Sequence, residues 1–184
     1  AIQELLSRYQ PPGRKLPDLP EPIGMISVPP IEFDESASIF DNLPPAVRSP
    51  QPGPMESYGQ NHGFILYRTK LLGHRGGKLT ATDLRDYAIV YADGRYVGTM
   101  DRTNGETTAL DIPKAEPANQ TLDILIEAMG RINYGPRLLD RKGITERVTL
   151  NSMTLMGWDV HPLPMDEDYL RLLRYARRPA ETPG

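Results

Sequence analysis

The sequence predicts an all-β protein, an antiparallel β-sandwich or jelly roll with short flanking helices. Between residues 63 and 160, short apolar runs follow one another, and several alternate apolar with polar residues as half-buried strands do. Turn-forming pairs such as Asp93-Gly94 separate neighbouring runs. Many short strands joined by turns are typical of a sandwich.

Composition excludes several classes of function. The chain has 184 residues, a net charge of −3 and 24% charged residues, which gives no reason to expect nucleic acid or an anionic membrane as a partner. It has no cysteine, so disulfides, thiolate catalysis and thiolate metal sites are excluded. No apolar run is long enough to span a bilayer.

The N-terminal segment predicts a short helix. Apolar residues from Ile2 to Tyr9 recur with helical spacing, and Pro11-Pro12 cannot continue the helix. The chain starts inside this helix, at Ala1, without Met and without a signal peptide. We therefore expect a fragment or a processed product. The compartment stays open between bacterial cytoplasm, periplasm and secretion.

Prolines dominate the next part of the chain, where 12 of the 19 precede Met55. Because proline cannot donate a hydrogen bond to a neighbouring strand, residues 11–30 are expected to form an extended connector. Apolar residues within this region predict two short edge strands, one near residues 26–33 and one near residues 37–40.

From Gly63 onward the pattern is that of strands separated by turns. Strands are expected at residues 63–69, 86–92, 95–100, 107–112, 122–128, 144–150 and 156–160. Asp93-Gly94 predicts a hairpin between the second and third of these strands, and Asn104-Gly105 predicts another between the third and fourth.

Core residues and a last helix complete the expected fold. Tyr87 and Tyr91 share a strand face with Ile89, which places them in the expected core. Trp158 lies among apolar residues and is expected there too. Residues 166–175 predict a terminal amphipathic helix.

The sequence predicts no catalytic residue, metal site or cofactor. Glycoside hydrolysis needs two carboxyl groups about 5 to 10 Å apart, whereas Asp123 and Glu127 on one strand face would be about 13 Å apart. Each is expected to be a surface residue or a partner of an arginine. The histidines are scattered without metal-ligand spacing: His62, His74 and His161. The oxygen-bearing side chains of Asp101, Asn104 and Glu106 could hold Ca²⁺, but a polar hairpin tip is preferred.

The Gly-rich segment after the strand at 122–128 offers the best candidates for a site. Candidate sugar contacts, because aromatic and hydrogen-bonding side chains can face a sugar ring, are Tyr134, Asn133, Arg131 and Tyr58. The preferred alternative is a structural turn network, in which Asp140 or Glu127 supplies a carboxylate to an arginine. That network comprises Gly130, Arg131, Asn133, Gly135, Asp140 and Gly143.

Several segments together resemble glycoside hydrolase family 35, the β-galactosidases. They are Pro54–Thr69 (PMESYGQNHGFILYRT), Asp86–Gly94 (DYAIVYADG), Ile126–Gly135 (IEAMGRINYG) with Asp140–Gly143 (DRKG), and Trp158–Pro164 (WDVHPLP). Order and spacing agree from about Ile2 to Met165. One departure is His62, where the family usually has Tyr.

The resemblance implies a division of labour within a longer enzyme. In that family a catalytic (β/α)₈ barrel holds both catalytic glutamates, and jelly-roll domains of the galactose-binding-like type follow it. No catalytic residue can be carried onto this chain. The expected parts are the last barrel helix with a linker at 1–22, an extended segment at 23–54 shared with a second sandwich, a jelly roll at 55–152, and an exit strand with helix and tail at 153–184.

The function implied is that of a non-catalytic sandwich that braces the barrel and shapes the active-site entrance. The parent enzyme would hydrolyse terminal β-galactosides with retention, while this chain alone is expected to be inactive. Two alternatives stay open: a free-standing galactose-binding module, and an interaction domain for a separate catalytic chain. The expected partners are the barrel domain and galactosides.

Overall fold

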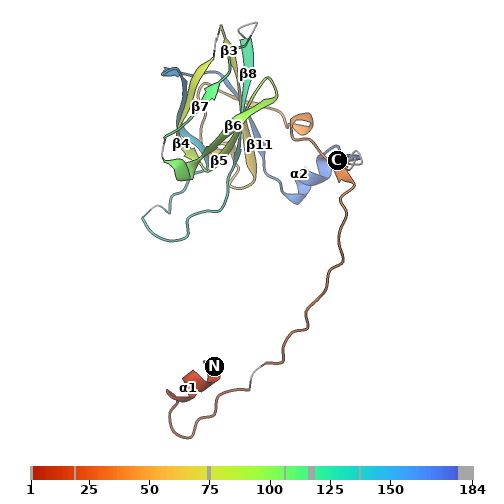
Figure 1. Ribbon diagram of the computed structural model, residues 1–184, viewed down its shortest axis with the longest axis vertical. Coiled ribbons are helices and arrows are strands. Elements are labelled where there is room, and N and C mark those ends of the chain that lie inside the picture. The colour runs from red at the N-terminus through yellow and green to blue at the C-terminus, as the bar shows by residue number, and fades with distance from the viewer. Residues whose placement is uncertain are drawn as a thin grey trace. The chain divides into compact units, whose positions relative to one another are not determined.

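The computed structural model describes residues 2–18, 20–73, 76–105, 107–115, 119–136 and 138–177 (Figure 1). The chain divides into two units, residues 1–33 and residues 34–184, and each is described by itself.

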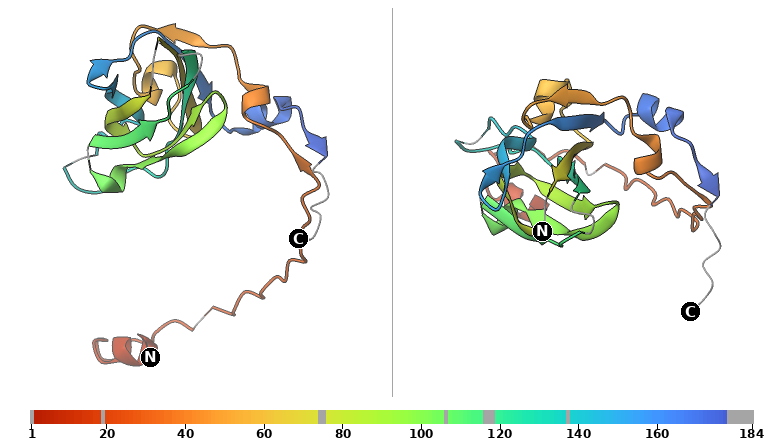
Figure 2. Two further views of the ribbon diagram at one scale, coloured as in Figure 1. Left: turned by 45° about the horizontal axis from the view of Figure 1, so that its top comes forward. Right: turned by 90° about the horizontal axis from the view of Figure 1, so that it is seen from above.

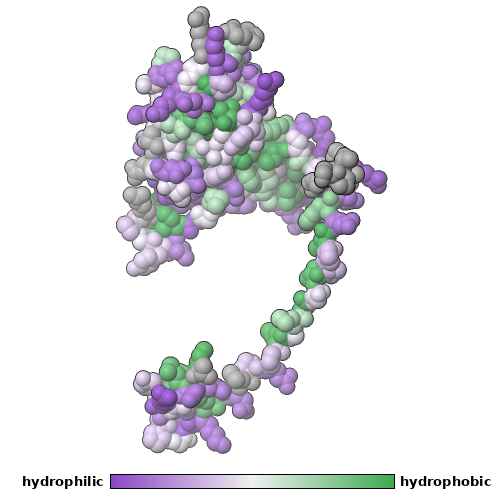
Figure 3. Space-filling model, viewed as in Figure 1, coloured by the Kyte–Doolittle hydropathy of each residue, from purple (hydrophilic) through white to green (hydrophobic). Residues whose placement is uncertain are grey.

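The first unit contains the helix α1 (Ile2–Ser7), which confirms the predicted helix. Its large apolar side chains are exposed, and so are those of the described residues from Ile23 to Phe33 in the extended segment that follows (Figure 3). No strand lies in the described residues of this unit, so the edge strand expected at 26–33 is wrong. The physical reason is Pro29-Pro30, because neither residue has an N–H to donate to a neighbouring strand.

The second unit contains two antiparallel sheets packed face to face (Figures 1 and 2). The six-stranded sheet has the order β2 (Val47–Ser49), β11 (Trp158–Leu163), β3 (Phe64–Leu72), β8 (Asn119–Glu127), β5 (Tyr87–Ala92) and β6 (Arg95–Asp101). The four-stranded sheet has the order β10 (Met153–Thr154), β9 (Gly143–Leu150), β4 (Gly77–Arg85) and β7 (Thr107–Ile112). The predicted fold class, an all-β sandwich with short helices, is confirmed.

Short elements flank the sandwich. They are the strand pair β1 (Glu35–Ser36) and β12 (Ala176–Arg177), the 3₁₀ turns η1 (Phe40–Asn42), η2 (Met55–Tyr58) and η3 (Arg102–Asn104), and the helix α2 (Glu167–Leu172). The strand expected at 37–40 is wrong, because Phe40 begins η1. The terminal helix is confirmed as α2, and Asp166 caps it by accepting a hydrogen bond from Tyr169 N at 2.8 Å.

The core lies between the two sheets and takes side chains from both. Trp158 is buried as predicted, edge-on to Tyr67 with 6.4 Å between ring centroids. The prediction that Tyr87 and Tyr91 lie in the core between the sheets is wrong, because both are half-buried. The buried face of β5 carries the alternate residues, Ala88, Val90 and Ala92. Tyr91 packs instead in a second apolar cluster with residues of η1 and α2, on the other side of the six-stranded sheet.

The turn at Asn104-Gly105 is not a hairpin, which corrects another expectation. β6 belongs to the six-stranded sheet and β7 to the four-stranded sheet, so η3 carries the chain from one layer to the other. Asp101 begins η3 by accepting a hydrogen bond from Thr103 N at 2.8 Å. An Asx-type turn of this kind can change the direction of the chain without pairing the flanking strands. Glu106, the third residue weighed for Ca²⁺, lies outside the described residues.

Replacing Gly63 with alanine should destabilise the sandwich strongly. Gly63 precedes β3 with φ +80°, and an added Cβ would lie 2.5 Å from the carbonyl oxygens of Leu163 and Pro164. The expected loss in the free energy of unfolding is about 2–4 kcal/mol, from the left-handed backbone and from overpacking. The matched control is Gly59→Ala, because Gly59 has φ +73° with no atom near the added Cβ.

The control should lose only about 1 kcal/mol, because it carries the backbone cost alone. Urea unfolding of both variants measures the difference. Equal losses in the free energy of unfolding would contradict the crowding of Gly63 by the backbone of Leu163 and Pro164.

Candidate functional site

A loop of residues 128–142 connects β8 to β9 at one end of the sandwich (the teal loop below β4 in Figure 1). β8 ends at Glu127, which pairs with Phe64 at the start of β3. The loop carries a group of exposed apolar and aromatic side chains, of which Tyr134 is 89% exposed: Met129, Tyr134, Leu138 and Leu139. Such a concentration at one place favours contact with a partner.

Beneath this loop Lys142 is fully buried, with 0% of its surface exposed. Its Nζ contacts Asp86 Oδ2, lies 2.7 Å from Asp140 Oδ2 and donates to the carbonyl oxygen of Gly130 at 2.8 Å. A buried ammonium group is tolerated only when it is paired. Lys142 therefore ties the beginning of the loop to its end.

Asp140, which is 2% exposed, lies at the centre of the buried charges. Arg85 and Arg102 each place a guanidinium nitrogen 3.0 Å from Asp140 Oδ1. Arg102 also pairs with Asp86, and Arg85 with Asp83, both at 2.6 Å. Three carboxylates thus meet three cations in what we call the charge network: Asp83, Asp86, Asp140, Arg85, Arg102 and Lys142.

The charge network joins the two sheets at this end. Arg85 ends β4 of the four-stranded sheet, and Asp86 directly precedes β5 of the six-stranded sheet. Asp83 lies at a bulge in β4 with φ +54°, where the register against β9 shifts between Thr82 and Leu84. The bulge breaks the strict alternation of β4 and turns its last residues toward the loop.

Arg131 fastens the loop from its outer side. Its guanidinium donates to the carbonyl oxygen of Asp140 at 2.7 Å and to that of Asn61 at 2.8 Å, and it pairs with Glu56 at 2.6 Å. Glu56 in turn accepts a hydrogen bond from Lys142 N at 3.1 Å. The carboxylate partner of Arg131 is therefore Glu56, not Asp140 or Glu127 as expected.

Acid should destabilise the sandwich through Asp140. Burial raises the pKa of this carboxyl, but hydrogen bonds from Lys142 and Arg85 outweigh burial and lower the pKa from 3.8 to about 2. Because the folded pKa is the lower one, this stabilisation is complete above about pH 4 and is lost as the pH falls toward 2. The amount is on the order of 2 kcal/mol.

Urea unfolding at about pH 6, pH 4 and pH 2.5 measures this loss. The midpoint should change little between the first two conditions and fall at the third. A midpoint that is constant to pH 2.5 would contradict the pairing of Asp140.

The residues predicted to close the turn divide into two groups. Gly130 and Asp140 contact Lys142, and Gly143 pairs with Arg85 at the start of β9. Asn133 and Gly135, by contrast, lie in the outer part of the loop. Lys142, Arg85 and Arg102 were not predicted. The local signal for each of the three is an opposite charge close in sequence. The pairs are Arg85-Asp86, Asp101-Arg102 and Asp140-Arg141-Lys142.

The predicted sugar contacts are also divided. Arg131, Asn133 and Tyr134 share the loop, whereas Tyr58 is half-buried and lines a pocket of about 490 Å³ with His62 and Tyr169. Tyr134 is not among the residues that line this pocket.

The remaining candidates have structural partners. Asp123 is buried and pairs with Arg68 at 2.6 Å, as expected of an arginine partner. His62 Nδ1 lies 2.6 Å from Asn61 Oδ1, and His161 Nδ1 lies 2.7 Å from the carbonyl oxygen of Pro44. His74 lies outside the described residues.

The described residues contain neither a metal-ligand cluster nor a helix that could cross a membrane. No group of three or more histidine, aspartate or glutamate side chains there has an arrangement that could hold a metal ion. None of the helices in that part of the chain is long and apolar enough to cross a membrane.

Comparison with known proteins places the sandwich in a family. Residues 52–164 match the family described as "Beta-galactosidase, first all-beta domain". A β-galactosidase of Xanthomonas manihotis is 44% identical over 155 residues, which cover 83% of this chain and 25% of that protein. β-Galactosidase 8 of rice, Oryza sativa subsp. japonica, is 35% identical over 170 residues, covering 84% and 25%. The human β-galactosidase is 35% identical over 112 residues, covering 59% and 16%. The chain spans about a quarter of the length of the first two relatives.

Proposed function

This chain belongs to the family of first all-β domains of β-galactosidases, and from that premise we propose that it is the non-catalytic sandwich of a larger β-galactosidase-like enzyme. The parent would be of glycoside hydrolase family 35 and would hydrolyse terminal β-galactosides with retention. The reacting groups would belong to a catalytic (β/α)₈ barrel in another part of the parent. Relatives about four times as long as the matched region are consistent with such a second domain.

The role of the sandwich is to brace the barrel and to shape the active-site entrance through the loop 128–142. The observation that carries this proposal is the combination of exposed Tyr134, Leu138 and Leu139 with a buried charge network beneath them. Exposed apolar side chains favour a partner, and a base of ion-paired side chains holds them in one arrangement. A rigid base of this kind lowers the entropic cost of docking.

The charge network itself is suited to structure and not to glycoside hydrolysis. A retaining glycosidase needs one free carboxylate and one protonated carboxyl group across the scissile bond. Asp83, Asp86 and Asp140 are each held by arginine or lysine. Such pairing keeps the pKa of Asp140 low, which is the opposite of what a general acid requires.

We further propose the domain boundaries expected from the sequence. The helix and linker at 1–22 would belong to the barrel's end, and the segment at 23–54 would contribute to a second sandwich. Exposed Ile23, Met25 and Phe33 in the extended segment support that assignment, because they have no apolar neighbour to cover them in this unit. The jelly roll would comprise 55–152, and the exit strand, helix and tail 153–184.

A free-standing galactose-binding module is the second candidate, and the exposure of Tyr134 favours it. An interaction domain for a separate catalytic chain would use the same loop.

Mixing the purified chain with the barrel-bearing part of the parent enzyme tests the proposal. The purified chain should bind the barrel-bearing part of the parent enzyme in isothermal titration calorimetry, and alone it should not hydrolyse a chromogenic β-galactoside above a mock preparation. Turnover by the chain alone would overturn the proposal. An absence of binding, with saturable galactose binding at Tyr134, would favour the free-standing module.

A further inference from the structure

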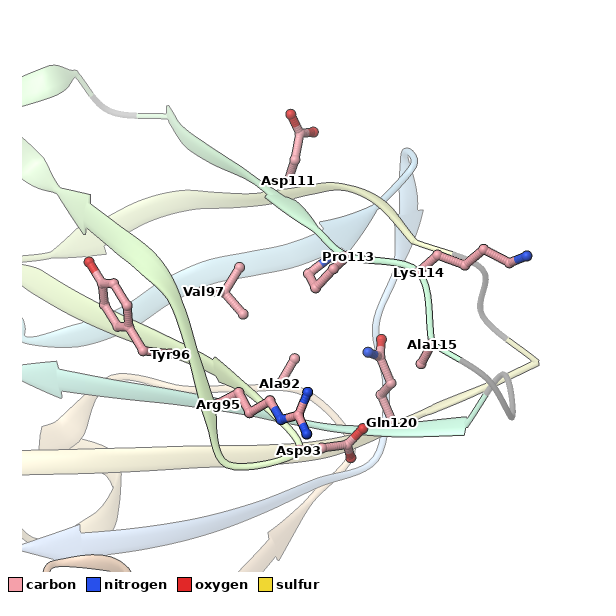
Figure 4. A pocket seen from close by; sticks show the side chains of 10 residues that line it. All are labelled: Ala92, Asp93, Arg95, Tyr96, Val97, Asp111, Pro113, Lys114, Ala115 and Gln120. Atoms are coloured by element: carbon pink, nitrogen blue, oxygen red, sulfur yellow. The ribbon is translucent and has the colours of Figure 1, made fainter.

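A pocket of about 760 Å³ opens at the end of the sandwich opposite the loop 128–142. The strand register fixes this position. β8 begins at Asn119 opposite Leu72 and ends at Glu127 opposite Phe64, so the two ends of β8 mark the two ends of the sandwich. We call the space lined by Ala92, Asp93, Arg95, Val97, Pro113 and Gln120 the end pocket (Figure 4). Docking through the loop would leave the end pocket open.

Gln120 is the feature of the end pocket that the fold does not explain. Only 5% of the residue is exposed, and its Oε1 is buried with no hydrogen-bond partner among the described residues. Figure 4 shows its amide directed into the pocket. A buried amide without a partner costs free energy that a leucine of similar size would not.

Gln60, a second buried glutamine, also has an Oε1 without a hydrogen-bond partner among the described residues, but its other amide atom is held by the fold. Its Nε2 donates to the carbonyl oxygens of His62 and Phe64, which gives that side chain a structural role. No such hydrogen bond fixes the amide of Gln120 in the described part of the chain. A ligand that donates a hydrogen bond to Oε1 would supply the missing partner.

Charges of both signs surround the mouth of the end pocket. Asp93 and Arg95 flank the β5–β6 turn, while Asp111 and Lys114 line the side formed by β7 and the residues after it. Asp93 is held in place because its Oδ1 accepts a hydrogen bond from Thr121 N at 2.8 Å. Two carboxylates and two cations give no net preference for an anion or a cation.

Apolar residues form part of the inner walls, and Tyr96 is the aromatic residue among those that line the pocket. The apolar residues are Ala92, Val97 and Pro113. Figure 4 shows the ring of Tyr96 turned away from the pocket, and it packs edge-on to Tyr91 with 6.3 Å between ring centroids. We therefore expect recognition in this pocket to depend more on hydrogen bonds than on stacking.

We propose that the end pocket binds a neutral saccharide unit, whose hydroxyl groups donate to Gln120 Oε1 and Asp93 and accept from Arg95. Hydroxyl groups both donate and accept, so a molecule that carries several of them matches a pocket with carboxylate, amide and guanidinium groups. A charged ligand would meet a like charge at the mouth. A pocket with a few convergent polar groups and apolar walls is typical of small-molecule sites.

The test is a titration of the full chain with galactose and with lactose, followed by ¹H–¹⁵N NMR. This choice of probes rests on the proposed function. We expect saturable shifts of the Gln120 side-chain amide and of the backbone amides of Ala92 and Arg95. No saturable shift with either sugar, or shifts centred on Tyr134, would overturn the proposal.

Two variants make the test specific. Gln120→Leu should weaken binding at least about tenfold while the urea midpoint stays unchanged or rises, because the lost amide has no partner in the fold. Glu146→Ala, at an exposed position of β9 that does not line the end pocket, should bind both sugars as the unaltered chain does. Unchanged binding by Gln120→Leu would overturn the proposal. Failure here would leave docking to the barrel and hydrolysis by the parent unaffected, so it is distinct from failure of the proposed function.

Discussion

Replacing Asp140 with alanine should lower the free energy of unfolding by about 3–5 kcal/mol, because it removes the central carboxylate and leaves buried cations without compensation. Among the described residues, Lys142 would retain only Asp86 as a charged partner, and Arg85 only Asp83. The charge network would then hold three cations against two carboxylates. Urea unfolding followed by circular dichroism measures the loss.

The matched control is Asp159→Ala, which also removes an aspartate from an ion pair in the sandwich. Asp159 pairs with Arg48 at 3.5 Å, and both side chains are exposed. The free energy of unfolding of Asp159→Ala should change by no more than about 0.5 kcal/mol, as is usual for exposed pairs. If the two variants lost the same amount, the charge network would not be the anchor of the loop.

Substituting the exposed loop should abolish docking without unfolding the chain. In the triple variant Tyr134→Ser, Leu138→Asp and Leu139→Asp, the affinity for the barrel-bearing part of the parent should fall at least about 100-fold, because each buried apolar side chain contributes about 1.5–3 kcal/mol. The urea midpoint of the isolated chain should stay the same, since all three side chains are exposed. Calorimetric titration measures the affinity.

Leu72→Asp is the control for this substitution. Leu72 is also an exposed leucine, but it ends β3 at the opposite end of the sandwich from the loop. Its affinity for the barrel-bearing part should equal that of the unaltered chain. Equal losses in both variants would indicate a general effect of charge on solubility or folding, and would contradict docking through the loop.

Local pattern predicted best the strands that have long apolar runs. β3 and β8 have long apolar runs, and both were found within a few residues of their true bounds. β4 was missed, because Ala81 and the threonines around it give a weak apolar signal, and the bulge at Asp83 breaks the alternation. The turn after β6 was misread as a hairpin because the sequence does not reveal in which sheet the next strand lies.

The candidate site could be predicted only in part. The Gly-rich loop and the involvement of Asp140 followed from the sequence, since turn residues and charges cluster there. The charged partners of Asp140 could not be predicted, because Arg85 and Arg102 are 55 and 38 residues away from it along the chain. The end pocket had no sequence signal either, since Gln120 joins residues of the β5–β6 turn only after β5 and β8 pair.

The measurement that tests the central claim most directly is β-galactoside hydrolysis by the whole parent enzyme, with and without the triple loop substitution, beside the isolated chain. We predict no turnover by the isolated chain. We also predict a loss of at least about tenfold in kcat/KM for the loop variant, because a misplaced active-site entrance lowers transition-state binding. Turnover by the isolated chain, or an unchanged kcat/KM in the loop variant, would contradict a non-catalytic sandwich that braces the catalytic barrel.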